Sequence, residues 1–391
     1  MSTVWYRGRL GDVCRVVPGY AFKSSDWRTA GIPVVKIKNI TGNNSVDLAT
    51  TDCVPESLLT QRLQKFVIKD GDILVAMTGA TAGKVGRVRT NRILLLNQRV
   101  AKIVAVDADP DFIWAVVSSQ EYQEKFFYLA DGAAQPNMSG SQIEGVDVPL
   151  PPRPAQQRIA GILSAYDELI ENNQQRIRIL ESMASALYRE WFVHFRFPGH
   201  EHHPRVASTL GEIPHGWKVN TAKNILARRP AGSVYREADV KPEGAIPVID
   251  QSTSELLGFH DNAPDHSASS ALPIAIFGDH TCKMQLLIEP FSVGPNVVPF
   301  VASQDMPTAY VFYAVNSLVH TQEYKRHWIP LSAKEVVVAD RMTAKRFSSL
   351  IRPMLVTQET HRKAIRNLRR TRDLLLPRLL SGQIEARPPE P

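Results

Sequence analysis

The sequence predicts an α+β protein: two mixed α/β globular modules separated by two long helices that form an antiparallel coiled coil, with a pseudo-twofold internal repeat. Three observations predict this class. Similar segments recur about 200 residues apart. Each module is followed by a stretch in which apolar residues repeat every seven positions. The chain of 391 residues is 43% hydrophobic and 22% charged, which is ordinary for globular domains with buried cores.

The first module is predicted to cover residues 1–150. Its β-rich segments lie at 32–40, 71–77 and 92–106, and an amphipathic helical stretch follows at 112–126.

The first long helix is predicted from about 154 to 195, within a segment of residues 151–197. Three prolines at its start are tolerated in a first helical turn. Two apolar columns with a seven-residue period then predict a coiled-coil seam. The seam residues of this helix are Leu163, Tyr166, Ile170, Asn173, Ile177, Leu180 and Leu187.

The second module is predicted to cover residues 198–338, with 198–208 as a linker. Its β-rich segments lie at 245–250, 272–277 and 293–301. An amphipathic stretch from 308 closes with 323–328, which matches 121–126 of the first module at an offset of 202 residues. We expect both closing stretches to be helical.

The second long helix is predicted at 339–382, followed by a tail at 383–391. Its seam residues are Ile351, Met354, His361, Ile365, Leu368 and Leu375. A shift of 188 residues places His361 at the position of Asn173. Because a lone polar residue in a seam usually fixes register, we interpret both as register-setting residues. An antiparallel pair of such helices would place the modules at opposite ends of a rod.

The positive charge is concentrated in the second long helix. The chain carries a net +7, but residues 341–380 alone contain eleven basic residues against two acidic ones. Such a helix suits a polyanion such as DNA. A solvated helix face and a surface for an acidic protein partner remain open.

The motifs that could carry chemistry fail their own spacing tests. The segment 78–85 has three residues between its glycines and Val85 after the lysine, which is not a P-loop. The segment 200–203 is not HExxH. The segment 323–325 with Asp305 could mimic a nuclease cluster, but its first-copy counterpart 121–123 has no lysine, and we expect both stretches to lie on helices with a core stripe. No nucleophile elbow, zinc-ligand pair, Rossmann fingerprint or methyltransferase-like segment occurs. The sequence therefore indicates a binding protein without catalytic or metal residues.

Targeting and redox features point to the cytoplasm. No apolar run approaches the roughly 18 residues of a membrane span, and no secretory signal is recognisable at the N-terminus. Three widely spaced cysteines without CxxC spacing favour a reducing compartment.

The duplication, the paired helices and several short segments together resemble the DNA-specificity subunit of type I restriction-modification systems. The similar segments are 19–25, 37–40, 71–75, 78–85, 96–99, 149–158, 246–252 and 276–281. The resemblance implies that the modules are target-recognition domains, each reading one half of a bipartite DNA target. It also implies that the helix pair sets the spacer and docks two methyltransferase subunits.

The resemblance further implies partners that carry the chemistry. Methyltransferase subunits would supply adenine-N6 methylation and motor-nuclease subunits ATP-dependent cleavage, so that S-adenosylmethionine, ATP and Mg are expected on partners and no cofactor in this chain. Double-stranded DNA is the expected ligand, and no membrane is involved.

Polar residues in the matching loops are the candidate DNA contacts, because amides and basic groups pair with base edges while hydroxyls and lysines suit phosphates. In the first module they are Lys23, Ser24, Ser25, Lys38, Asn39, Thr78, Thr81, Lys84, Gln98, Gln135 and Asn137. In the second module they are Tyr235, Arg236, Gln251, Ser252, Asp279, His280, Thr281 and Lys283.

Three alternatives stay open at this point. The chain could serve a type II-like methyltransferase or nuclease assembly, act as a coiled-coil scaffold whose modules bind proteins, or hide an active site of its own. Salt-sensitive DNA binding with one preferred split sequence would separate a sequence reader from a scaffold.

Overall fold

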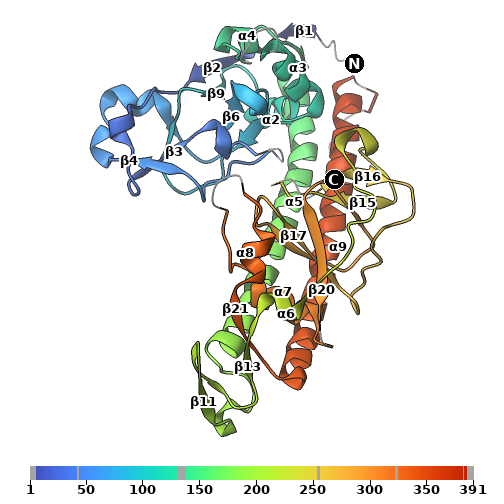
Figure 1. Ribbon diagram of the computed structural model, residues 1–391. Helices are drawn as coiled ribbons and strands as arrows, with labels where there is room; N and C mark the ends of the chain where they lie inside the picture. Colours follow the sequence, from blue (N-terminus) through green and yellow to red (C-terminus); the bar gives the residue numbers. More distant parts are fainter. Residues whose placement is uncertain are drawn as a thin grey trace, which may run out of the picture. The chain divides into compact units, whose positions relative to one another are not determined.

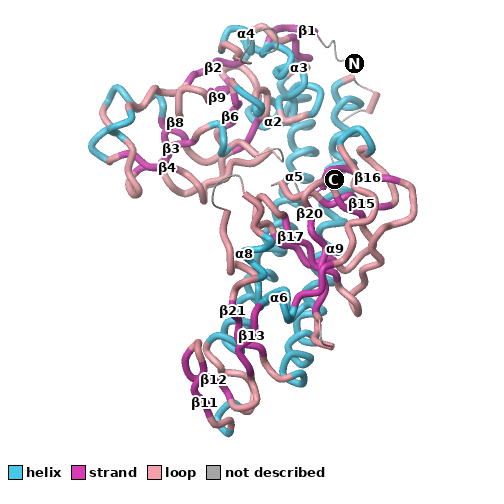
Figure 2. The backbone as a smooth tube through the Cα atoms, in the orientation of Figure 1, coloured by secondary structure: helices cyan, strands magenta, loops and turns pink. Residues whose placement is uncertain are grey.

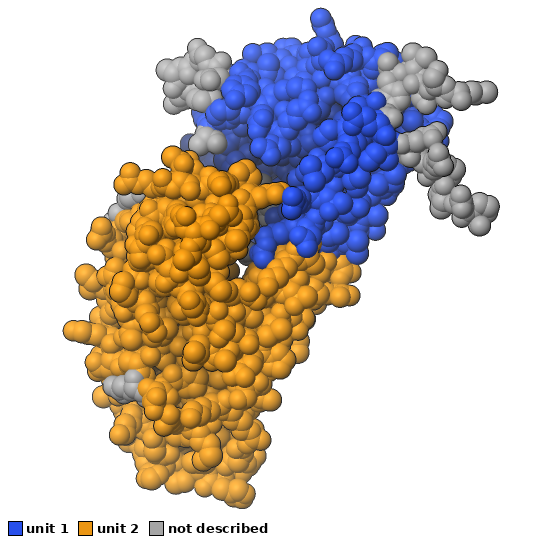
Figure 3. Space-filling model, turned by 90° about the vertical axis from the view of Figure 1, so that its right-hand side faces the viewer, with its two compact units in different colours: residues 1–171, 366–391 blue, residues 172–365 orange. Residues whose placement is uncertain are grey.

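The computed structural model describes residues 6–41, 44–130, 137–252, 256–303, 305–321, 325–381 and 383–384. It divides the chain into two compact units, drawn in different colours in Figure 3. Unit 1 contains Met1–Glu171 and Arg366–Pro391, and unit 2 contains Asn172–Ile365. Each unit therefore combines one module with a segment of each long helix.

The module of unit 1 contains two four-stranded sheets and a strand pair (Figure 1). Its strands are β1 (Tyr6–Arg9), β2 (Cys14–Pro18), β3 (Ile32–Val35), β4 (Asp52–Val54), β5 (Val67–Ile68), β6 (Ile73–Ala76), β7 (Val85–Arg87), β8 (Leu94–Leu96), β9 (Val100–Ala105) and β10 (Asp147–Leu150). Its helices are α1 (Leu10–Val13), α2 (Pro110–Val117), α3 (Gln120–Ala130) and α4 (Gly140–Glu144). The strand orders are β2-β9-β6-β7 and β4-β3-β8-β5, and β1 pairs with β10.

The module of unit 2 repeats this plan and adds a hairpin. Its strands are β11 (Arg205–Ser208), β12 (Gly211–Pro214), β13 (Lys218–Thr221), β14 (Leu226–Arg228), β15 (Ile246–Ile249), β16 (Leu256–His260), β17 (Ile274–Gly278), β18 (Met284–Leu287), β19 (Ser292–Val293), β20 (Val297–Ala302) and β21 (Glu335–Val338). Its helices are α6 (Ala222–Ile225), α7 (Thr308–Val315) and α8 (Trp328–Ser332).

The two modules share their topology. The antiparallel order β2-β9-β6-β7 returns as β14-β20-β17-β18, and the parallel pair β3–β8 returns as β15–β19. The pair β1–β10, which precedes the first long helix, returns as β13–β21 before the second. The predicted internal repeat is confirmed.

Two long helices complete the fold: α5 (Arg153–Tyr188), which continues as a π-helical turn over Arg189–Val193, and α9 (Arg341–Leu380). Their segments run antiparallel within each unit. In unit 1, Asp167 contacts Arg372. In unit 2, Asn173 contacts His361 and, further along, Tyr188 packs on Phe347. Every predicted seam residue is buried or partly buried, which agrees with the predicted α+β class.

The two helices begin differently. At the start of α5 the backbone amides of Ala155 and Gln156 donate to the carbonyl of Pro152. At the start of α9 the carboxylate of Asp340 accepts the amides of Met342 and Thr343 at 2.9 Å each, which is an N-cap. Asp340 therefore replaces the prolines that precede α5.

Two expectations for the second module were wrong. Residues 325–327 are not helical. The buried Asp279 carboxylate accepts the backbone amides of His327 at 3.0 Å and Trp328 at 2.9 Å, and these bonds fix the segment that directly precedes α8. Residues 323 and 324 lie outside the described part of the chain. The expected linker also ends in a strand, because β11 pairs with β12 in a hairpin that is plain in Figure 2.

Among the helices of the described residues, none is both long and apolar enough to cross a membrane.

Candidate nucleic-acid interface

The first-module segments with candidate residues lie between β2 and β3, after β3, between β6 and β7, between β8 and β9, and between α3 and α4. Lys23, Ser24 and Ser25 are exposed in a short turn that begins where the Lys23 amide donates to Asp26 at 2.8 Å. Lys38 is exposed and lies 3.1 Å from Asp52. Hydrogen bonds from Lys36 and from Lys38 lower the pKa of the Asp52 carboxyl.

Asn39 does not fit the role expected of it. Its side chain is fully buried, its Oδ1 accepts the Lys36 amide at 2.9 Å, and its Nδ2 donates to the Asp47 carbonyl at 3.0 Å. Because both polar atoms of the amide are used inside the loop, Asn39 shapes the loop and is withdrawn from the DNA-contact set.

The glycine-rich loop at 78–84 turns inward. The hydroxyls of Thr78 and Thr81 are buried and have no hydrogen-bond partner among the residues that the structure describes. A Cβ on Gly83 would lie 2.6 Å from the backbone nitrogen of Phe127, so only glycine allows this contact with α3. Asn137, which is exposed, forms an isolated β-bridge with Thr78, and Gln135 lies outside the described residues.

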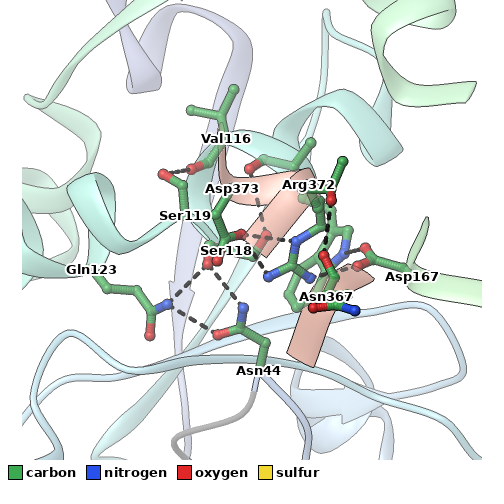
Figure 4. A network of polar contacts seen from close by, with 12 residues as sticks. Asn44, Val116, Ser118, Ser119, Gln123, Asp167, Asn367, Arg372 and Asp373 are labelled. Atoms are coloured by element: carbon green, nitrogen blue, oxygen red, sulfur yellow. Dashed lines mark hydrogen bonds and ion pairs between the residues drawn. The ribbon is translucent and has the colours of Figure 1, made fainter. Parts of the chain in front are cut away.

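Lys84 lines a pocket of about 490 Å³ between this loop, α3 and α9. On one side, Gln123 Nε2 donates to the Asn44 side chain at 3.0 Å and to the Ser118 carbonyl at 2.9 Å (Figure 4). Arg369 and Arg372 of α9 line the pocket as well. Lys84 is therefore partly enclosed within unit 1.

A polar triad of one buried and two partly buried side chains attaches the first module to the helix pair. Arg372 Nη1 donates to Asp167 Oδ1 at 2.6 Å, and Trp114 Nε1 donates to Asp167 Oδ2 at 2.8 Å (Figure 4 shows the arginine and the aspartate). Arg372 also pairs with Asp373 at 2.9 Å. Burial opposes the charge on the guanidinium, but the two carboxylates raise the pKa of Arg372 above its usual range.

Several cations of the basic helix α9 are paired inside their own unit. Besides Arg372, three more form ion pairs: Arg341–Asp305 at 2.7 Å, Arg362–Glu181 at 3.0 Å and Lys363–Glu289 at 2.9 Å. These pairs favour a structural role for these four cations. Two of these paired cations, Arg341 and Lys363, are exposed, and the other exposed basic residues of the helix are Lys345, Arg346, Arg352, Arg370 and Arg378.

In the second module, the loop after β15 and the loop between β17 and β18 are bonded together. Thr281 Oγ1 donates to the Gln251 carbonyl at 2.7 Å, and the His280 amide donates to Gln251 Oε1 at 3.1 Å. Lys283 Nζ donates to the carbonyls of Asp250 and Ser252 at 2.9 Å each. The structure thus brings together five of the predicted residues: Gln251, Ser252, His280, Thr281 and Lys283.

Two of the second-module candidates bond to the backbone of their own module and stabilise its loops. Asp279 is buried and holds the start of α8 through its carboxylate, so it is withdrawn from the DNA-contact set. The ammonium of Lys283 ties its loop to the 250–252 backbone, which makes Lys283 a positioning residue.

Tyr235 and Arg236 lie on a separate loop. The Tyr235 ring stacks on the imidazole of His260 with centroids 4.2 Å apart. Arg236, the next residue, is exposed. Its backbone amide donates to the Asp239 carboxylate at 2.8 Å.

A buried His–Ser contact that sequence reasoning missed is not a catalytic pair. His260 Nε2 lies 3.0 Å from Ser292 Oγ, while His260 Nδ1 accepts the Asn262 amide at 3.1 Å. Since Nδ1 is an acceptor, Nε2 of a neutral imidazole carries the proton and donates to Ser292, so the ring cannot act as a base toward that hydroxyl. Nor do the described residues contain a cluster of potential metal ligands.

Comparisons with known proteins agree with this duplicated plan. A family model described as the type I restriction modification DNA specificity domain matches residues 4–182. The MjaIX type I restriction enzyme specificity subunit of Methanocaldococcus jannaschii is 23% identical over 317 residues, covering 74% of this chain and 73% of that protein. The putative MjaX specificity subunit of the same organism is 25% identical over 250 residues, covering 60% and 56%.

A solved structure supports the fold. The type I restriction-modification S subunit from M. genitalium aligns with a TM-score of 0.51 at 16% identity and covers 97% of this chain and 96% of its own. The fold and the comparisons together describe a two-module protein that is similar to these specificity subunits. The family model covers the first module and most of α5, and the MjaIX subunit extends the similarity to type I specificity subunits over about three quarters of the chain.

Proposed function

We propose that this chain is the non-catalytic, sequence-specific DNA-binding subunit of a type I restriction-modification complex. Each module reads one half of a bipartite target in double-stranded DNA. The helix pair sets the length of the spacer. The observation that carries this proposal is the repeated module topology, in which loops at equivalent strand ends carry exposed or half-exposed polar side chains.

The DNA-contact residues we propose are those candidates that the fold leaves at least partly accessible. They are Lys23, Ser24, Ser25, Lys38, Gln98, Asn137, Tyr235, Arg236, Gln251, Ser252, His280 and Thr281. Thr78, Thr81 and Lys84 are secondary candidates, because their loop packs against α3.

The catalytic steps belong to partners in this proposal. Two methyltransferase subunits bind the helix pair and use S-adenosylmethionine to methylate adenine N6. Motor-nuclease subunits use ATP and Mg to cleave unmodified DNA. The complex works in the cytoplasm.

Long-read mapping of methylated adenines in the source cell tests the proposal. The map is made with this reading frame intact, deleted and restored. We expect deletion to remove one split motif and restoration to return it, which would also reveal both half-sites and the spacer. If every methylation motif survives deletion, the proposal is wrong, and a protein-binding scaffold becomes the better hypothesis.

A further inference from the structure

The side-chain amide of Gln251 is fixed in one orientation by its neighbours. The atom that faces the His280 backbone N–H at 3.1 Å must be the oxygen, because an N–H can only donate. Gln251 Nε2 forms no hydrogen bond with any residue that the structure describes. Gln251 is partly exposed, and its amide group has an unused N–H₂ donor, whereas its oxygen already accepts one hydrogen bond.

The loop around Gln251 is held tightly enough to keep this orientation. The Thr281 hydroxyl donates to the Gln251 carbonyl at 2.7 Å, and Lys283 holds the residues on either side of Gln251. A Cβ on Gly278 would lie 2.9 Å from the Gln251 Cβ and 2.5 Å from the Thr281 hydroxyl. Glycine at 278 thus lets the two loops close on each other, and rotation of the Gln251 amide would break its bond to His280.

We propose that Gln251 is a specificity-determining residue that reads DNA only as a donor and selects a guanine in the half-site of the second module. A glutamine with both amide atoms available pairs with adenine through N6 and N7. One lone pair of the Gln251 oxygen is taken by the His280 amide, whereas both hydrogens of its N–H₂ group are unused among the described residues, so the donor side is the one offered to a base. Guanine presents two acceptors, O6 and N7, in the major groove, where adenine and thymine present one each, so it offers the most partners to an N–H₂ donor. This inference rests on the proposed function.

Gln98 of the first module is the matched control. It lies on the loop between β8 and β9, is exposed, and its side chain forms no hydrogen bond with a described residue. Its amide is not held in one orientation, and it belongs to the other module. A change at Gln98 acts on the other half-site if it acts at all.

The test compares Gln251→Ala, Gln251→Glu and Gln98→Glu with the wild type in the full chain. Methylation motifs are mapped in cells that carry each allele. Competition binding of the purified chain then compares duplexes that differ in one base pair. We expect Gln251→Ala to relax one G·C pair in one half-site. Gln251→Glu keeps an oxygen for His280 but turns its free atom into an acceptor, so we expect preference for that pair to fall by about tenfold.

The outcomes separate this inference from the proposed function. If the wild type has no split motif, the proposed function fails. If the wild type has one and Gln251→Ala relaxes an A·T pair, or no pair, the donor-only assignment is wrong. It is equally wrong if both Gln251 variants melt like the wild type yet bind no DNA, because one lost base contact would not abolish binding. Gln98→Glu must leave the affected G·C pair unchanged.

Discussion

The two units attach their modules to the helix pair by different chemistry. In unit 1 the contact is the polar triad of Trp114, Asp167 and Arg372. In unit 2 it is a cluster of aromatic rings from α5, α7 and α9, in which Phe347 lies 5.2 Å from Phe192 and 5.9 Å from Tyr188. The same architecture is therefore stabilised by a hydrogen-bonded ion pair in one copy and by apolar burial in the other.

The 188-residue shift that superposes the sequence of α5 on that of α9 shows which residues of unit 2 replace the charged residues of the triad. It places Leu355 at the position of Asp167 and Ala184 at the position of Arg372, and both apolar residues are buried in the core of unit 2. If two copies of α5 paired with each other, Asp167 would face the alanine position instead of an arginine. An unpaired buried charge is costly. The polar triad thus favours pairing of α5 with α9, whereas the aromatic cluster contributes mainly burial.

The largest effect is expected in the aromatic cluster. Phe347→Ala removes a fully buried ring that contacts Tyr188, Trp191 and Phe192. We expect a loss of about 3–5 kcal/mol in the free energy of unfolding of unit 2, because the cavity cannot collapse among rigid rings. Denaturant unfolding followed by tryptophan fluorescence measures it.

Leu350→Ala is the control for this change. Leu350 lies on the same helix but is 47% exposed, so its truncation should cost well under 1 kcal/mol. Equal costs at the two positions would mean that the aromatic cluster does not hold unit 2 together.

In the triad of unit 1, one substitution should lower the free energy of unfolding by less than Phe347→Ala does, and two further substitutions should restore it. Asp167→Leu leaves the indole N–H of Trp114 unpaired and Arg372 with only Asp373. We expect a loss of about 2–3 kcal/mol. Trp114→Phe and Arg372→Ala added to Asp167→Leu give unit 1 the apolar residue types of unit 2. We expect the triple variant to return to within about 1 kcal/mol of the wild type.

Unfolding curves and hydrogen exchange in the last turns of α9 measure this recovery. If the triple variant is as unstable as Asp167→Leu alone, the triad stabilises through its own bonds and not only by avoiding unpaired charge.

The architecture was predictable because it is encoded in periodicity. The seven-residue rhythm of α5 and α9 and the 188-residue shift do not depend on side-chain partners, and the shift correctly paired Asn173 with His361, which lie 2.5 Å apart. Such patterns survive in a single sequence because helix faces are set by the backbone.

The site was less predictable because the direction of a loop side chain is a tertiary property. Asn39 and Asp279 have the residue types of DNA contacts, yet both turn inward and bond to backbone groups. Asp167 was not recognised, since it stands outside the apolar columns and its partner Arg372 is 205 residues away in sequence. A basic helix likewise does not reveal which of its charges meet carboxylates in the folded chain.

A pH effect that acts through the cap of a long helix is expected in unit 2, where Asp340 caps α9. Burial of Asp340 opposes its charge, but hydrogen bonds from Thr343, Met342 and Trp217 outweigh it and lower the pKa of its carboxyl. A lowered pKa in the folded state contributes stability above the ordinary value of about 4, and this contribution is lost as the pH falls through the folded pKa.

Asp340→Asn tests this effect. The asparagine still caps the helix, but its Nδ2 faces the Trp217 and Thr343 donors, so we expect unfolding at pH 7 to cost about 1 kcal/mol less than in the wild type. The difference should shrink below pH 4. Unchanged pH dependence of unfolding in the variant would show that other carboxylates dominate. In unit 1 the equivalent position is Pro152, which does not titrate.

The smallest effect is expected where equivalent positions of the two helices meet. In an antiparallel pair related by a twofold shift, equivalent residues contact each other only at the centre, and Asn173 and His361 are such a pair. A double-mutant cycle of Asn173→Ala and His361→Ala should give a coupling of about 0.5–1.5 kcal/mol. The same cycle with Arg176→Ala, an exposed position on α5, should give none. A coupling near zero for Asn173 and His361 would mean that register is set by the apolar layers on either side. A clear coupling would make this polar contact the point at which the two dissimilar halves are aligned.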